Sequence, residues 1–102
     1  DYSPEELVEI TKLMAKNKDN IIDESALEKI RGIYNDAVKI SDFGNGRYAR
    51  NIIEKAELNR ATRLAKFSFD EVTKDMIETF LPEDFEANKK QVKEEKRIGF
   101  LS

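Results

Sequence analysis

Residues 43–64 read FGNGRYARNIIEKAELNRATRL, and this stretch decides which fold the chain is expected to adopt. Apolar side chains recur in it every three or four residues, which predicts one buried face of a long helix over residues 46–67. These apolar residues are Ala49, Ile52, Ile53, Ala56 and Leu64. A Gly-Asn-Gly turn comes directly before the helix, so a break in the chain is expected there.

Two arginines, Arg47 and Arg50, lie in the first two turns of this helix. A helix start carries a partial positive charge, so a cation there costs a few tenths to about 1 kcal/mol unless an anion is nearby. The helical wheel places both arginines opposite the apolar face. Spare backbone N–H groups and two guanidinium groups therefore predict a site for an anion, with phosphate as the usual ligand.

The other two arginines of the helix, Arg60 and Arg63, fall on or beside the apolar face. We expect them to cover the core with their alkyl stems or to pair with acids, and not to bind a ligand. For Arg47 and Arg50 ordinary ion pairing is the alternative interpretation. Arg50 could reach Glu54 four residues on, and Asp42 could approach Arg47 from the preceding loop.

The composition excludes several kinds of site. Among 102 residues there is no cysteine and no histidine. Disulfides, thiolate metal sites and histidine-dependent catalysis are therefore excluded. No glycine-rich phosphate loop ends in Gly-Lys-Ser/Thr, and no calcium-loop spacing occurs. We expect no metal site and no self-contained active site, so the chain on its own is not expected to be an enzyme.

The cellular compartment is predicted from the absence of two sequence features, a membrane-spanning run and a signal peptide. No apolar run approaches the roughly 20 residues that span a bilayer, and no signal peptide is visible. We therefore expect a cytoplasmic protein without a membrane partner. The chain starts with Asp-Tyr, which suggests a piece of a longer protein.

Charge is distributed unevenly along the chain. Residues 1–43 hold ten acids and six bases, a balance of −4; residues 44–67 hold two acids and six bases, giving +4; residues 68–102 hold nine acids and six bases, giving −3. A basic helix thus lies between acidic segments. Packing of this helix against acidic neighbours explains the pattern equally well, and it does not exclude an anion site at the helix start.

Two further helices are expected before this one. Ser3, Pro4 and Glu6 form a capping box, so a first helix should begin there and end near residue 17. Ser25 and Glu28 suggest a second box and a helix ending near residue 41. The predicted buried faces comprise Leu7, Val8, Ile10, Thr11, Met14 and Ala15 in the first, and Leu27, Ile30, Ile33, Tyr34, Ala37 and Val38 in the second. Gly32 interrupts the second helix, and a mid-helix glycine usually permits close packing.

The C-terminal third is less regular. Thr73 should cap a short helix that turns Met76 and Ile77 inward, and residues 80–81 should be extended before Pro82. The fold class is therefore an all-α small helical bundle with three main helices, a short fourth and a charged tail. We expect one domain over residues 1–88 and a tail over 89–102, read as a solvated helix or a frayed end.

A family resemblance rests on the motif GNGRYARN at residues 44–51. EKA at 54–56, RATRL at 60–64 and LPEDF at 81–85 extend it, so that it covers most of residues 3–86. The pattern resembles the C-terminal lid of AAA+ ATPases. It is most similar to the CbxX/CfqX branch, which includes rubisco-activating proteins and the stage V sporulation protein K type. Residues 44–51 are its specific part, and the flanking helices are generic amphipathic sequence.

The resemblance implies a role for each motif residue. Arg47 would be the sensor-2 arginine, which contacts the phosphates of a nucleotide held by the ATPase core. Arg50 matches the second arginine of the motif, and Gly44, Asn45 and Gly46 would form the nucleotide-facing turn. The cofactor would be ATP with Mg²⁺ in the full-length parent only. The implied partners are the core of the same parent chain, neighbouring subunits of a hexameric ring and a protein substrate that is remodelled.

The chain has no Walker A lysine and no Walker B carboxylates, so by itself it should not hydrolyse ATP or require a cofactor. Two rival functions stay open. A stand-alone helical protein–protein interaction module would dock an acidic partner on the basic helix without nucleotide. A nucleic-acid binder would use the same helix, but the net charge of −3 argues against nucleic acid as a partner.

Overall fold

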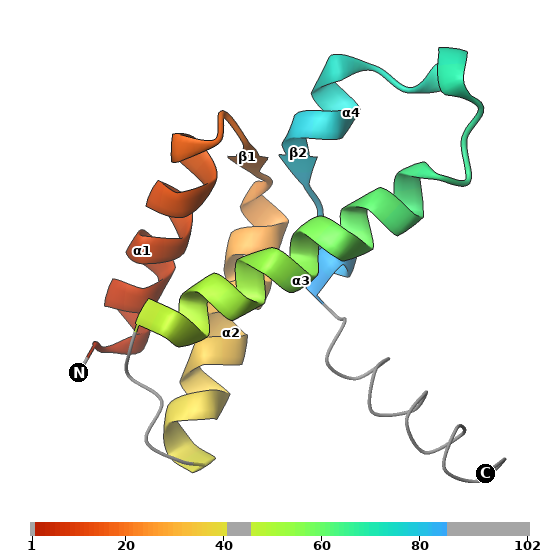
Figure 1. The fold of residues 1–102 in the computed structure, drawn as a ribbon. Coiled ribbons are helices and arrows are strands. Elements are labelled where there is room, and N and C mark those ends of the chain that lie inside the picture. The colour runs from red at the N-terminus through yellow and green to blue at the C-terminus, as the bar shows by residue number, and fades with distance from the viewer. Residues whose placement is uncertain (1, 41–45, 86–102) are drawn as a thin grey trace, which may run out of the picture.

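The computed structural model describes residues 2–40 and 46–85, which form a bundle of helices with one very short sheet (Figure 1). The elements are α1 (Pro4–Asn17), β1 (Ile21–Ile22), α2 (Glu24–Ile40), α3 (Gly46–Leu64), η1 (Phe69–Glu71), α4 (Lys74–Glu78), β2 (Thr79–Phe80) and η2 (Pro82–Phe85). The predicted all-α class and the order of three long helices and a short fourth are confirmed. The predicted tail over 89–102 lies outside the described residues.

The first helix begins as its capping box predicts. The Ser3 backbone N–H donates to Glu6 Oε1 at 2.8 Å, and the Glu6 N–H donates to Ser3 Oγ at 3.2 Å. The second box is wrong. The helix α2 already begins at Glu24, so Ser25 lies inside its first turn, where the hydroxyl bonds to the carboxylate of Asp23.

A two-residue parallel ladder joins the segment between α1 and α2 to the segment that follows α4. Ile21 pairs with Thr79 and Ile22 with Phe80, although the strands are far apart in sequence (Figure 1). The Asp23 N–H extends the ladder by donating to the Phe80 carbonyl at 3.1 Å. The sequence analysis expected extended chain near residue 80 but no partner for it. The ladder ties the end of the domain to the turn between α1 and α2.

The helix α1 packs against both α2 and α3, and η2 packs between α2 and α3. The predicted apolar faces of the long helices are confirmed where side chains are described. The core comprises Leu7, Val8, Ala15, Ala26, Ile30, Tyr34, Ala49, Ile52, Ile53, Ala56, Phe80 and Phe85. The Phe80 and Phe85 rings lie 5.6 Å apart, so the chain after α4 adds two aromatic side chains to a core that the helices mainly supply.

Two expectations about packing are wrong. A Cβ added at Gly32 would meet nothing within 4 Å, so this glycine does not serve a close helix contact. Ile77 is 50% exposed, whereas Met76 in the same five-residue helix is partly buried. The helix α3 ends at Leu64, three residues earlier than its periodicity suggested.

Candidate functional site

The start of α3 presents Arg47 and Arg50 to solvent, as the helical wheel predicted. The buried residues of this helix are Ala49, Ile52, Ile53 and Ala56. With 100° between successive residues, Arg47 lies opposite this buried face, while Arg50 leans towards its α1 side. The two side chains therefore leave the same helix start in different directions.

No acid lies in the first turn of α3, whereas α1 and α2 both have glutamate there. Within the described ranges, the predicted ion pair of Arg50 with Glu54 does not form, and no ion pair involves Arg47. The alternative partner Asp42 falls outside the described residues. Among the residues described, the charge at this helix start is thus left without a compensating acid.

Arg50 borders a hollow of about 210 Å³ between the end of α1 and α3. The other lining residues are Met14, Asn17, Lys18, Ile53 and Glu54. Lys18 also pairs with Glu57 across this junction, with Nζ and Oε2 3.1 Å apart. Arg50 therefore faces a recess between two elements and not open solvent alone. The pattern of α3 alone does not predict this recess, because the α1 wall is remote in sequence.

A second hollow of about 280 Å³ runs along the outward face of α3. It is lined by Tyr48, Asn51, Ile52, Glu54, Lys55 and Leu58. Leu58, one of these lining residues, is 66% exposed. Arg47 and this hollow share one outward side of the helix, so a body that met Arg47 from outside would also cover the hollow.

The tyrosine beside Arg47 anchors the helix start. Tyr48 packs edge-on against Tyr34, with ring centroids 5.8 Å apart, and burial raises the pKa of Tyr48. Tyr34 itself is fully buried and hydrogen-bonded to Thr11, whose hydroxyl donates to the Leu7 carbonyl at 2.8 Å. Arg47 thus projects from a helix turn that is held by aromatic packing.

The expected nucleotide-facing turn is only partly described. Gly44 and Asn45 fall outside the described residues. Gly46 is the first residue of α3, and its φ is not positive. A Cβ at Gly46 would meet nothing within 4 Å. Open space in front of this residue is compatible with close approach of another molecule.

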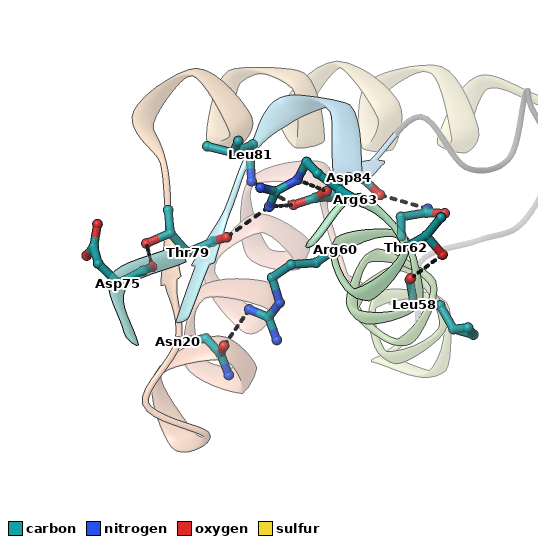
Figure 2. A network of polar contacts seen from close by, with 10 residues as sticks. Asn20, Leu58, Arg60, Thr62, Arg63, Asp75, Thr79, Leu81 and Asp84 are labelled. Carbon is teal, nitrogen blue, oxygen red and sulfur yellow. Dashed lines mark hydrogen bonds and ion pairs between the residues drawn. The ribbon is translucent and has the colours of Figure 1, made fainter. Parts of the chain in front are cut away.

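Arg60 and Arg63 serve the fold, as expected from their place beside the apolar face. The Arg63 guanidinium donates to both carboxylate oxygens of Asp84, at 3.0 and 2.9 Å, and this hydrogen-bonded carboxylate raises the pKa of Arg63 (Figure 2). Arg60 lies 4.1 Å above the ring of Phe80 and donates to Asn20 Oδ1 at 2.6 Å. Both are therefore occupied within the domain.

Asp84 is the polar residue that the sequence analysis missed. It is 1% exposed and also accepts the Leu81 N–H at 2.9 Å (Figure 2). It belongs to the LPEDF segment at 81–85, but its spacing from other residues does not predict that it is buried. Its partner on α3 is 21 residues away, and only the fold brings the two together.

Across residues 2–40 and 46–85, no group of three or more acidic, histidine or cysteine residues could hold a metal ion. Within the same ranges, every helix is too short or too polar to cross a bilayer.

Comparison with known proteins connects this geometry with a family. Residues 3–95 match the family described as the AAA lid domain. The ESX-1 secretion system protein EccA1 of Mycolicibacterium smegmatis is 33% identical over 107 residues, covering 96% of this chain and 19% of that protein. The chloroplastic ribulose bisphosphate carboxylase/oxygenase activase of Cyanidioschyzon merolae is 31% identical over 90 residues, covering 83% of this chain and 29% of that protein.

A third relative is the ESX-5 secretion system protein EccA5 of Mycobacterium marinum, 37% identical over 84 residues that cover 70% of this chain and 14% of that protein. The chain thus spans less than a third of the length of each of these relatives. The family match takes in every element of the fold, from the capping box of α1 to η2. The chain belongs to the AAA lid domain family.

Proposed function

We propose that this domain is the C-terminal lid of an AAA+ ATPase of the CbxX/CfqX type, and that Arg47 contacts the phosphates of ATP bound by another part of the parent chain. In this role the lid closes over Mg-ATP and couples hydrolysis to remodelling of a protein substrate. Arg50, with the turn of Gly44, Asn45 and Gly46, lies at the same nucleotide-facing end. The lid itself has no catalytic or cofactor-dependent activity.

One observation carries the proposal: an outward-facing arginine at a helix start that has no acid in its first turn. A planar guanidinium group matches the oxygens of a phosphate and stays charged at every physiological pH. Phosphates would also stabilise a cation that the helix terminus disfavours. Two unrelated features, the side chain and the backbone of the helix start, therefore both suit the same ligand.

The apolar surface beside Arg47 indicates which side of α3 another part of the parent chain would cover. The hollow beside it and the exposed Leu58 give the outward side of α3 an apolar area. We propose that the ATP-binding part of the same chain covers this side, so that Arg47 reaches the nucleotide at its edge. The partners are this core, adjacent subunits of a hexamer and a protein substrate, in the cytoplasm. The relative named an activase of ribulose bisphosphate carboxylase/oxygenase supports a protein as substrate.

The test is the substitution Arg47→Ala in the full-length parent. Hydrogen bonds to charged groups contribute about 1.5–3 kcal/mol, so ATP turnover should fall roughly 10- to 100-fold. Arg47→Lys keeps the positive charge but loses the planar guanidinium group. Its ATP turnover should lie between that of the parental protein and that of Arg47→Ala. Turnover is measured as phosphate release, and nucleotide affinity is measured with a fluorescent ATP analogue.

Arg31→Ala is the matched control. The side chain of Arg31, on α2, is 43% exposed, and among the described residues it pairs with exposed Glu5, with Nε and Oε2 3.0 Å apart. Removing such a surface pair costs 0 to about 1 kcal/mol of stability, so turnover should stay at the parental value. If Arg47→Ala also kept the parental turnover and nucleotide affinity, the proposed role of Arg47 would be rejected.

A further inference from the structure

The first turn of α3 packs on the core through one large side chain. The turn comprises Gly46, Arg47, Tyr48 and Ala49. Arg47 is exposed, and Ala49 is fully buried but small. Tyr48 is partly buried and packs against the hydrophobic core of the domain. The orientation of the turn therefore depends more on the tyrosine ring than on any other side chain within it.

The Tyr48 ring lies at the end of a series of contacts that joins the three long helices. It meets the Tyr34 ring of α2 edge-on, with ring centroids 5.8 Å apart and an angle of 63° between the ring planes. The Tyr34 hydroxyl is hydrogen-bonded to the Thr11 hydroxyl of α1, and both residues are fully buried. Thr11 donates in turn to the Leu7 carbonyl at 2.8 Å. The ring on which Tyr48 packs is therefore itself held in place by α1.

This ring pair has a directional preference that the rest of the α3 interface lacks. The positive edge of one aromatic ring favours the negative face of another, so the angle between them matters. The next large buried side chains of α3, Ile52 and Ile53, are aliphatic, and burial of aliphatic surface is non-directional. The tyrosine pair therefore opposes a rotation of α3 about its own axis that aliphatic packing would resist less.

Such a rotation would move the Arg47 side chain directly. Arg47 immediately precedes Tyr48 and leaves the helix on its exposed side. Side chains reach about 5–6 Å from the axis of a helix, so a rotation of about 15° displaces their ends by about 1.5 Å. A displacement of about 1 Å in a group that orients a substrate can lower a rate by about 100-fold. A small change at the tyrosine ring is thus sufficient to alter ATP turnover.

We infer that Tyr48 is a positioning residue for ATP hydrolysis by the parent: its ring, packed on Tyr34, sets the direction in which Arg47 leaves the start of α3. The inference rests on the proposed function, in which Arg47 contacts the phosphates of ATP. Tyr48 acts through Arg47 and not by a contact of its own with the nucleotide. Tyr34 and Thr11 hold the ring that Tyr48 packs against.

The experiment is a double-mutant cycle with Tyr48→Leu and Arg47→Ala in the full-length parent. Leucine keeps an apolar side chain at position 48 but removes the ring that meets Tyr34. We expect Tyr48→Leu alone to lower ATP turnover about fivefold to tenfold. In the Arg47→Ala background the same substitution should change turnover by less than about twofold, because the arginine through which the tyrosine acts is missing.

Two control variants separate positioning from stability. Tyr48→Phe keeps the ring and should retain at least about half of the parental turnover. Phe85→Leu removes one ring of another aromatic pair in the core, whose other member is Phe80. Phe85 follows Asp84, which bonds to the last turn of α3 through Arg63, so this variant should lower the free energy of unfolding without changing turnover. Unfolding of every variant is measured by urea denaturation, and turnover is measured where each is folded.

The outcomes separate this inference from the proposed function. If Tyr48→Leu keeps the parental turnover, or lowers it by the same factor with and without Arg47, the inference is overturned and the role of Arg47 stands. An equal fall of turnover in Phe85→Leu overturns it too, because lost stability is then the cause. If Arg47→Ala keeps the parental turnover, the proposed function fails and the inference fails with it. A fall in Arg47→Ala that Tyr48→Leu does not deepen supports both.

Discussion

At the scale of single residues, Gly32 weakens the helix that contains it. It lies in the interior of α2, is exposed, and makes no contact that a larger residue would disturb. Glycine in a helix interior costs roughly 0.5–1 kcal/mol relative to alanine, because the unfolded chain has more conformations to lose. Gly32 therefore lowers the free energy of unfolding of the domain, and no contact of this glycine offsets the loss.

Gly32→Ala should raise the free energy of unfolding of the domain by roughly 0.5–1 kcal/mol, measured by urea denaturation. Gly46→Ala is the control, since Gly46 also has free space around it but sits at the first position of α3. A helix end is less sensitive to propensity, so the gain there should be smaller. A loss of stability in Gly32→Ala would show that α2 has a contact at this position that the structure lacks.

At the scale of elements, the segment that contains β2 and η2 is held onto α3 by one buried carboxylate. Asp84 accepts two bonds from Arg63, and the Asn59 side-chain amide donates to its carbonyl at 3.0 Å. The side chain of Arg63 is only 17% exposed, so neither charge is well solvated. Removal of one partner of such a pair leaves the other charge without compensation.

Asp84→Asn should therefore lower the free energy of unfolding by about 2–4 kcal/mol. Hydrogen exchange should show the loss locally, at the Asp23 amide that donates to the Phe80 carbonyl. Glu5→Gln, which breaks the exposed pair with Arg31, should cost 0 to about 1 kcal/mol. Equal losses in the two variants would contradict the role assigned to Asp84.

At the scale of the whole molecule, the buried Tyr34 hydroxyl joins α1 and α2 at the centre of the core. Burial, the main cause, raises the pKa of Tyr34 from 10.0 to about 12. The folded state therefore favours the neutral phenol more strongly than the unfolded chain does. This contribution to stability is complete below pH 10 and is lost as the pH rises towards 12.

The free energy of unfolding should thus fall between pH 10 and pH 12, by roughly 2–3 kcal/mol from this group. Tyr34→Phe removes the titration and, at neutral pH, costs about 1 kcal/mol for the lost hydrogen bond to Thr11. Lysines titrate in both proteins, so the difference between their urea stabilities isolates Tyr34. Parallel pH profiles of the two proteins would refute the assignment.

Much of the fold was predictable because its determinants are local. The capping box at Ser3 and the apolar faces of the helices depend on residues within one or two turns of each other. The outward direction of Arg47 follows from the same periodicity. By contrast, the hollow beside Arg50 needs the end of α1, and the partner of Arg63 lies 21 residues away. A periodic pattern carries no information about which remote element supplies such a neighbour.

The sequence by itself determined that this chain is helical, where α1 begins, and which side of α3 shows its arginines, because spacing along a helix sets the direction of each side chain. Only the tertiary structure decided that Asp84 is buried, that β1 pairs with β2, and that Phe69 is left uncovered. The physical reason is that burial is a property of neighbours in space. Neighbours that are remote in sequence are chosen by how the elements pack, and not by any one of them alone.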